Sequence, residues 1–262
     1  MRLLPFLAAI AIVTNPGLSQ ENSHSDVWQR MLQDAYSAHL SRVRAMLPPH
    51  SGLPPLLDLM QEQDQVKSDK DRAWEDRFKG LGMQDVSDLG VPGPSEATSI
   101  DTTFVDGVGR PSALPARGSE AIVIATVTAA SARVAYTHTI VYSQYCLRIS
   151  KVLKGKSKAG FREGRQVVAV QFGGRVLVPS GHMTSYIMPG HGFLDVGKQY
   201  VVFIWTPPHT KTFTIANPYL IQDGLVFPLN TEPDVSAYKN GMSIRNFETR
   251  VKNAIAKNID TD

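Results

Sequence analysis

The sequence predicts a mainly β protein with flanking helices, of the α+β class. Five short runs of strand-forming residues occupy residues 121–229, and glycine-containing turns separate them. Apolar side chains recur at helical spacing before residue 50 and again after residue 243. The chain has 262 residues and a single cysteine, Cys146, so no intramolecular disulfide can support the fold. Its stability must therefore come from a packed core.

The N-terminus has the pattern of a signal peptide. One charge at Arg2 precedes the uncharged apolar residues 3–13, and Gly17 and Ser19 supply small residues before a cleavage position. This apolar run is too short to span about 30 Å of hydrocarbon as a helix. We predict cleavage of residues 1–19 before Gln20 and a secreted or periplasmic location; the alternative is an uncleaved anchor. No later run predicts a transmembrane span in the mature chain.

Charge divides the remaining chain into two parts. Residues 20–100 carry 13 acidic and 8 basic side chains, a net charge of −5, whereas residues 101–262 carry 11 and 18, a net charge of +7. This asymmetry indicates two segments with different roles, or one segment lying across the other. We predict four segments: an acidic helical segment (20–80), a Gly/Pro-rich linker or arm (81–117), the β module (118–229), and a C-terminal helix and tail (230–262).

Helical patterns come first in the acidic segment. Apolar positions recur at steps of three and four from Trp28 to Leu47, Ser25 or Asp26 can cap the helix, and Pro48 ends it. A second helical candidate begins after Pro55, with Leu56 and Leu57, and then runs into a tract of alternating charges. We expect that tract to form a solvated helix.

The β module contains two kinds of strand pattern. Residues 122–127 and 200–205 are apolar on both faces, which suits central strands covered on both sides. Residues 139–149 alternate, with Tyr145 and Leu147 facing one way and Arg148 the other. Residues 166–172 end at Gly173 and Gly174, where we expect a bulge or sharp bend. The final run is 223–229, and the turns fit an antiparallel barrel or sandwich.

A docking helix is predicted at the C-terminus. Ser243 can cap it, and Phe247, Val251 and Ile255 recur at four-residue spacing. One apolar stripe of this kind indicates a helix that packs against the β module on one side.

Several phrases in the β module resemble a known group of proteins. AIVIATVT, LRISKVLKGK, GRQVVAVQFGG, DVGKQYVVFIW and DGLVFPL are similar to exported bacterial proteins whose strand layout resembles the OB-like barrel of the netrin and tissue-inhibitor-of-metalloproteinase type. The resemblance covers about residues 120–229 and implies an OB-like antiparallel β-barrel. Those inhibitors act through an amino-terminal cysteine, but the predicted mature chain starts at Gln20. The resemblance therefore implies the fold without the inhibitory mechanism.

Basic residues gather in one part of the module. Eight of them fall within 28 residues that contain one acidic residue, Glu163: Arg148, Lys151, Lys154, Lys156, Lys158, Arg162, Arg165 and Arg175. One interpretation is a solvated hairpin tip. A second is a site for anionic surfaces outside the cytoplasm or for the protein's own acidic half. Nucleic acid is not expected, because of the leader and because aromatic residues are sparse in the cluster.

The seven histidines suggest a metal site. The best candidates are His182 and His191, with His209 beyond the next strand, but no tight pair such as HExxH occurs. The sequence contains no GxSxG motif, so it predicts no serine nucleophile of that type. Gly173 and Gly174 lack the further glycines and the following helix of a phosphate-binding loop. We expect Cys146 to be a small strand residue.

The sequence therefore favours a non-enzymatic binding or interaction module, with no assigned catalytic residue and no expected cofactor. The predicted partner is an envelope or extracellular protein or an anionic surface, bound by the basic hairpin (Arg148, Lys151, Lys154, Lys156, Lys158, Arg162, Arg165). An inhibitor of an extracellular hydrolase, by analogy of fold, is one alternative. A metal-dependent hydrolase using His182 and His191 is the second.

Overall fold

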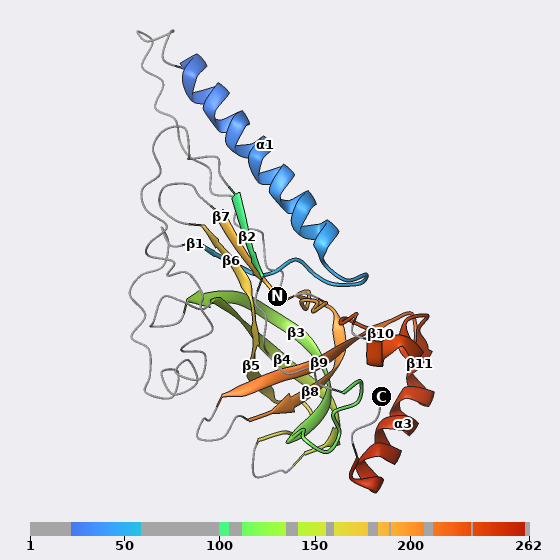
Figure 1. Ribbon diagram of the computed structural model, residues 1–262. Helices are drawn as coiled ribbons and strands as arrows, with labels where there is room; N and C mark the ends of the chain where they lie inside the picture. The colour runs from blue at the N-terminus through green and yellow to red at the C-terminus, as the bar shows by residue number, and fades with distance from the viewer. Residues whose placement is uncertain are drawn as a thin grey trace.

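The computed structural model describes residues 22–58, 100–104, 112–134, 141–155, 160–177, 183–188, 190–206, 212–231 and 233–259. The elements, in chain order, are α1 (Asn22–Met46), β1 (Leu56–Asp58), β2 (Ile100–Phe104), β3 (Ala121–Val134), β4 (Val141–Lys154), β5 (Gln166–Phe172), β6 (Gly174–Leu177), β7 (Met183–Ile187), β8 (Gln199–Trp205), β9 (Phe213–Gln222), β10 (Leu225–Pro228), η4 (Pro233–Tyr238), β11 (Met242–Ser243) and α3 (Ile244–Lys257). The protein is thus mainly β with a helix toward each end, as predicted (Figure 1). The predicted signal peptide lies outside the described residues.

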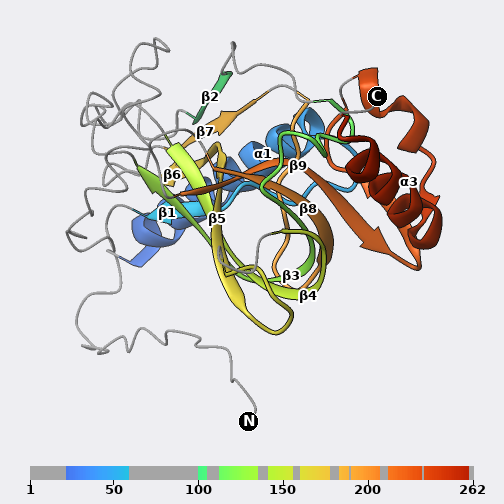
Figure 2. The ribbon, with the colours of Figure 1, turned by 90° about the horizontal axis from the view of Figure 1, so that it is seen from below.

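Five strands close into an OB-like barrel. β3 pairs with β4, β4 with β5, β8 with β3 and β9 with β8, all antiparallel. A short parallel pairing of β5 with β9, at Ala169 and Val170, completes the ring (Figure 2). This strand order, with its one parallel seam, is that of the partly open OB barrel. The antiparallel OB-like barrel is confirmed, and the parallel seam refines it.

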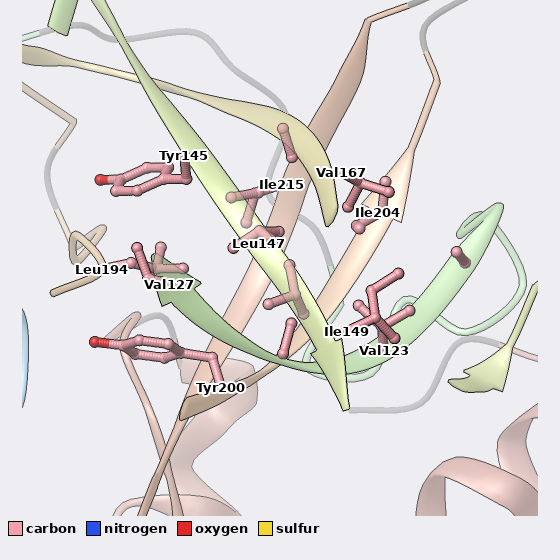
Figure 3. Close-up of a cluster of buried hydrophobic side chains, with 14 of the residues drawn as sticks. Val123, Val127, Tyr145, Leu147, Ile149, Val167, Leu194, Tyr200, Ile204 and Ile215 are labelled. Carbon is pink, nitrogen blue, oxygen red and sulfur yellow. The ribbon is translucent and has the colours of Figure 1, made fainter. Parts of the chain in front are cut away.

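The inside of the barrel is apolar. Figure 3 shows side chains from all five strands that meet there, including Val123, Leu147 and Ile204, each 0% exposed. Along β4, Tyr145 and Leu147 point inward, whereas Arg148 is exposed. The predicted alternation is therefore confirmed over the described part of that run. Both predicted central strands are also buried on both faces, because α3 and its neighbours cover the outside of β3 and β8.

A smaller sheet of order β1-β6-β7-β2 lies beside the barrel (Figure 1). It forms because Gly173 bends the chain sharply between β5 and β6 at a φ of +94°, as the sequence predicted. One face of the small sheet packs on the far ends of β3 and β4, through Val176 and Tyr186. The other face packs against α1, through Ile187.

The N-terminal helix is confirmed, with corrections at its start and in the segment after it. α1 begins at Asn22, so Ser25 and Asp26 lie inside it and do not cap it. The second helical candidate is wrong where the structure describes it: Leu56–Asp58 is the strand β1, parallel to β6. The edge of β6 carries backbone N–H and carbonyl groups that need hydrogen-bond partners, and this short apolar segment supplies them by pairing as a strand. The remainder of that candidate lies outside the described residues.

The structure describes two parts of residues 81–117, the segment predicted as a linker or arm. Ile100–Phe104 forms β2, which pairs in parallel with β7. Ala113 and Leu114 are buried beside α3, and the hydroxyl of Tyr219 on β9 donates to the carbonyl of Ala113. The arm therefore contributes to the covered side of the barrel.

The C-terminal helix docks on the barrel as predicted. The Ser243 hydroxyl accepts a hydrogen bond from the backbone N–H of Asn246 and caps α3. Phe247 and Val251 are fully buried, and the Phe247 ring lies 4.7 Å from that of Tyr219. Among the described residues, neither α-helix has the length and apolar character required to cross a membrane.

Candidate functional site

Three exposed arginines lie together at one end of the barrel. Arg148 projects from the outer face of β4, opposite Gln166 of β5. Arg162 and Arg165 are exposed in the turn that precedes β5. That turn is fixed to β4, because the backbone N–H of Ile149 donates to the Arg165 carbonyl at 2.9 Å. The structure therefore brings these three predicted residues together.

Two other members of the predicted basic hairpin already have partners. Lys151 Nζ lies 2.7 Å from both carboxylate oxygens of Glu248 on α3. Lys154 Nζ donates to the carbonyl of Ala116 at 2.5 Å, which fixes the arm against β4. These lysines position α3 and the arm. Lys156 and Lys158 lie outside the described residues.

Arg175 does not belong to this basic surface. Its side chain is only 7% exposed and lies under α1, where Nε donates to the carbonyl of Pro54 at 2.7 Å and Nη1 donates to the hydroxyl of Tyr36 at 3.4 Å. Burial with these partners makes Arg175 a structural residue of the α1 interface. Its nearness in sequence to Arg165 is misleading, because the bend at Gly173 carries it into the other sheet.

The Lys151–Glu248 ion pair joins α3, which carries further exposed cations, to the strand of Arg148. Arg245 and Lys252 are exposed on α3, three residues before and four after Glu248, so they lie on the same helix flank. We call this surface the cationic band; its members are Arg148, Lys151, Arg162, Arg165, Arg245 and Lys252. Sequence reasoning missed the helix cations, because they are about a hundred residues from the hairpin and only the tertiary contact joins them.

The outer face of the barrel beside the band is rich in hydrogen-bonding groups. Gln166 and Ser150 are exposed and Gln144 is half-buried. The nearby aromatic side chains of Phe161, Tyr142 and Phe172 are 3%, 7% and 7% exposed. The Ser150 hydroxyl donates to the carbonyl of Ile124 at 3.0 Å, so it serves the barrel itself. In this described part of the face, arginines and amides are therefore available to a ligand, whereas ring faces for stacking are not.

The protein's own N-terminal helix does not cover the band. α1 packs on the small sheet through Val43 and Leu47, which contact Ile187 and Phe193. Figure 1 shows α1 and α3 at opposite ends of the molecule. The interpretation in which the acidic half neutralises the basic cluster is therefore wrong for α1.

A buried serine–histidine pair was not anticipated from the sequence. His39 Nε2 and Ser185 Oγ are joined by a 2.8 Å hydrogen bond, and the two residues are 1% and 0% exposed. Such burial keeps substrate from the hydroxyl, so the pair serves to attach α1 to β7. Neither residue lies in a recognisable motif, and their separation of 146 residues along the chain hides the pairing.

The predicted metal ligands are not brought together in the described structure. Only His191 of the candidates is described, because His182 and His209 lie outside; the described residues contain no group of three histidine, cysteine or acidic side chains able to hold a metal ion. The His182–His191 site stays a prediction.

Cys146 is half-buried in β4, the strand position expected for it.

Burial lowers the pKa of His191 to about 4 from its ordinary value of 6.5, so the folded protein keeps this imidazole neutral. Below pH 6.5 the unfolded chain gains a proton here that the folded chain takes up only near pH 4. We therefore expect the free energy of unfolding to fall by up to about 3 kcal/mol between these pH values from this residue. Above pH 6.5 the imidazole is neutral in both the folded and the unfolded chain, so His191 causes no loss in the free energy of unfolding there.

The His191→Gln variant tests this expectation. Urea unfolding at intervals from pH 7.5 to pH 4 should show a shallower acid loss of stability in the variant than in the unmodified chain. Parallel curves would mean that His191 is solvated in the folded protein. Other histidines contribute equally to both curves and cancel in the comparison.

Comparison of the chain with protein-family models and with curated proteins finds no match. The class that the structure itself defines is an OB-like barrel with a helix toward each end and a cationic band on its outer side.

Proposed function

We propose that this protein is a non-enzymatic binding module that holds an anionic glycan against the cationic band. The observation that carries the proposal is the Lys151–Glu248 ion pair, which joins α3 and its exposed cations to β4, the strand that carries Arg148. The leader predicted from the sequence supports a role outside the cytoplasm, where charged sugar polymers occur at cell surfaces.

Arginine chemistry supports an anionic ligand. The planar guanidinium groups of Arg148, Arg162 and Arg165 can each donate two parallel hydrogen bonds to a sulfate, phosphate or carboxylate. Because these side chains are exposed, they can reach such groups without moving the barrel. Ion pairing across an open surface is screened by salt, so the interaction should weaken as ionic strength rises.

A glycan accounts for the uncharged part of the surface better than a membrane does. The side-chain amide of Gln144 and the side-chain oxygen of Gln166 can exchange hydrogen bonds with sugar hydroxyls. Val168, 44% exposed on β5, is an isolated apolar contact, whereas membrane insertion requires a broad apolar face. The lack of exposed rings in this part of the surface also disfavours base stacking.

Charge removal within the band tests the proposal. The double variant Arg148→Gln/Arg165→Gln should bind a sulfated heparin octasaccharide about five- to thirtyfold more weakly, since it loses two exposed charge interactions. Isothermal titration calorimetry at low and at physiological salt should also show a smaller salt dependence for the variant.

The matched control is Arg30→Gln/Arg42→Gln, which removes two exposed cations from α1, far from the band. We expect this control to keep most of the affinity. Equal losses in both variants would show that only net charge matters. Binding to vesicles of anionic phospholipid without binding to the octasaccharide would replace the glycan with a membrane surface.

A further inference from the structure

A groove of about 210 Å³ lies on one flank of α3. Four residues of the helix line it at intervals of three and four and so form one stripe: Arg250, Asn253, Ala254 and Lys257. The cationic band uses the opposite flank of α3, because its residues Arg245 and Lys252 are displaced from this stripe by about half a helical turn.

The floor of the groove is apolar and closely packed. Leu114, Tyr238 and Ala254 form it, and each of them is no more than 2% exposed. The Tyr238 ring is held by edge-on contacts with the rings of Tyr219 and Phe247, both at 5.7 Å between centroids. The groove is therefore formed by the fold itself, and a ligand does not have to order it.

The rim of the groove is cationic at both ends. Arg250 and Lys257 are exposed, and their positions in the helix are about 10 Å apart along its axis. The Arg250 guanidinium lies over the Tyr238 ring, 5.6 Å from its centroid, and this face contact leaves the N–H edge to donate to another group. Asn253 lies between the two cations, and none of the described lining residues is acidic. The groove therefore favours negative charge on both sides of an apolar centre.

The volume of the groove suits one side chain better than a whole small molecule. An apolar cavity of about 150 Å³ holds one benzene ring, whereas sites for drug-sized ligands are about 300–1,000 Å³ and bury most of the ligand. At about 210 Å³, and with an exposed rim, this groove accommodates one leucine-sized or phenylalanine-sized group. An apolar side chain that enters such a pocket is the usual anchor of a protein interface.

We propose that the groove binds an acidic segment of a partner protein, which inserts one apolar side chain and places carboxylates against Arg250 and Lys257. Charge complementarity favours this partner, because the described lining supplies two cations, one amide and no carboxylate. An extended segment covers the distance between the two cations in about three residues. Acidic residues directly before and after the apolar anchor can therefore reach both cations.

This second site is independent of the glycan surface, because it lies on the other flank of α3. A sulfated glycan matches the charge of the rim but supplies no apolar side chain for the floor. Ile259, 40% exposed, extends the apolar lining where the helix ends. An apolar anchor between carboxylates therefore matches the described lining better than a sugar polymer does.

A blocked synthetic peptide tests the site. Two aspartates precede its central leucine and two follow it, and a control peptide has serine in place of the leucine. Titration of the leucine peptide into the ¹⁵N-labelled full chain should shift the amide signals of Asn253 and Ala254. The serine peptide should bind roughly tenfold more weakly, because it does not bury a leucine side chain. Equal affinities of the two peptides would overturn the proposal, and so would shifts confined to the cationic band.

Charge removal at the rim tests the two cations. Arg250→Gln/Lys257→Gln should bind the leucine peptide about three- to thirtyfold more weakly, because two exposed ion pairs are lost. The matched control, Arg30→Gln/Arg42→Gln, makes the same change of net charge on α1 and should keep most of the affinity. All four side chains are exposed, so both variants should keep the fold. Equal losses would show that only net charge matters and would overturn the site.

Three further measurements identify a different occupant. Larger shifts of the groove amides with the heparin octasaccharide than with the leucine peptide would assign the groove to a glycan. Hexanoate that binds there as tightly as the peptide would assign it to a small carboxylate. Sedimentation velocity that shows a dimer, lost in Arg250→Gln/Lys257→Gln, would assign it to a second copy of this chain. Each of these results would overturn the acidic partner segment.

Discussion

Replacing Gly173 with alanine is expected to cost at least about 3 kcal/mol of folding free energy. Its φ of +94° is strained for any residue with a Cβ, which accounts for about 1–2 kcal/mol. The added Cβ would also lie 2.6 Å from the backbone carbonyl oxygen of Tyr186 and 2.9 Å from the Phe193 ring. Because a backbone atom cannot rotate away, either β6 or β7 would have to move. Urea unfolding measures the loss.

Gly197→Ala separates the two causes. Gly197 has a similar φ of +86°, and an added Cβ there meets nothing within 4 Å. Its variant should lose about 1–2 kcal/mol, from backbone strain alone. Equal losses at both positions would mean that β7 is not packed closely over the bend, which would contradict the described arrangement of the two sheets.

Truncating Phe247 to alanine is expected to cost about 3–5 kcal/mol, the range for removing a fully buried aromatic ring. Its side chain is 0% exposed and packs 4.7 Å from Tyr219 and 5.7 Å from Tyr238, measured between ring centroids. The helix would lose its main anchor to the barrel. Because Glu248 is the next residue, the Lys151 ion pair would weaken as well, and glycan affinity should fall with stability.

Thr249→Ala provides the control within the same helix. Thr249 is exposed, and its hydroxyl only donates to the carbonyl of Arg245. Such a surface change should alter the unfolding free energy by no more than about 0.5 kcal/mol. A loss below about 1 kcal/mol for Phe247→Ala would show that α3 is not docked, and the helix cations could then not be assigned to the band.

Several elements could be predicted because their patterns record local burial. Residues 122–127 and 200–205 are apolar on both faces, since one face lines the barrel and α3 and its neighbours cover the other. The alternation around Tyr145 and Leu147 reflects one buried and one wet face. Ser243 and Phe247 identified the last helix by its cap and its apolar spacing.

Other elements depend on neighbours that no local pattern reveals. β9 was missed because Asn217 and Pro218 interrupt its apolar run, and proline is rare inside sheets. The fold accommodates both residues. The Asn217 amide donates to the carbonyl of Ala113, and its side-chain oxygen accepts from Asn230 at 2.8 Å. Leu56–Asp58 likewise becomes a strand only because β6 pairs with it.

By itself, the sequence determined the class of the fold, the two described helices, the central strands and the approximate place of the basic residues, because side-chain periodicity and composition encode which faces are buried. Only the tertiary structure decided which cations are available. It buries Arg175 beneath α1, engages Lys151 and Lys154, leaves Arg148, Arg162 and Arg165 exposed, and joins α3 to β4 through Lys151. Charge is a property of each residue, whereas its availability depends on partners that are distant in the chain.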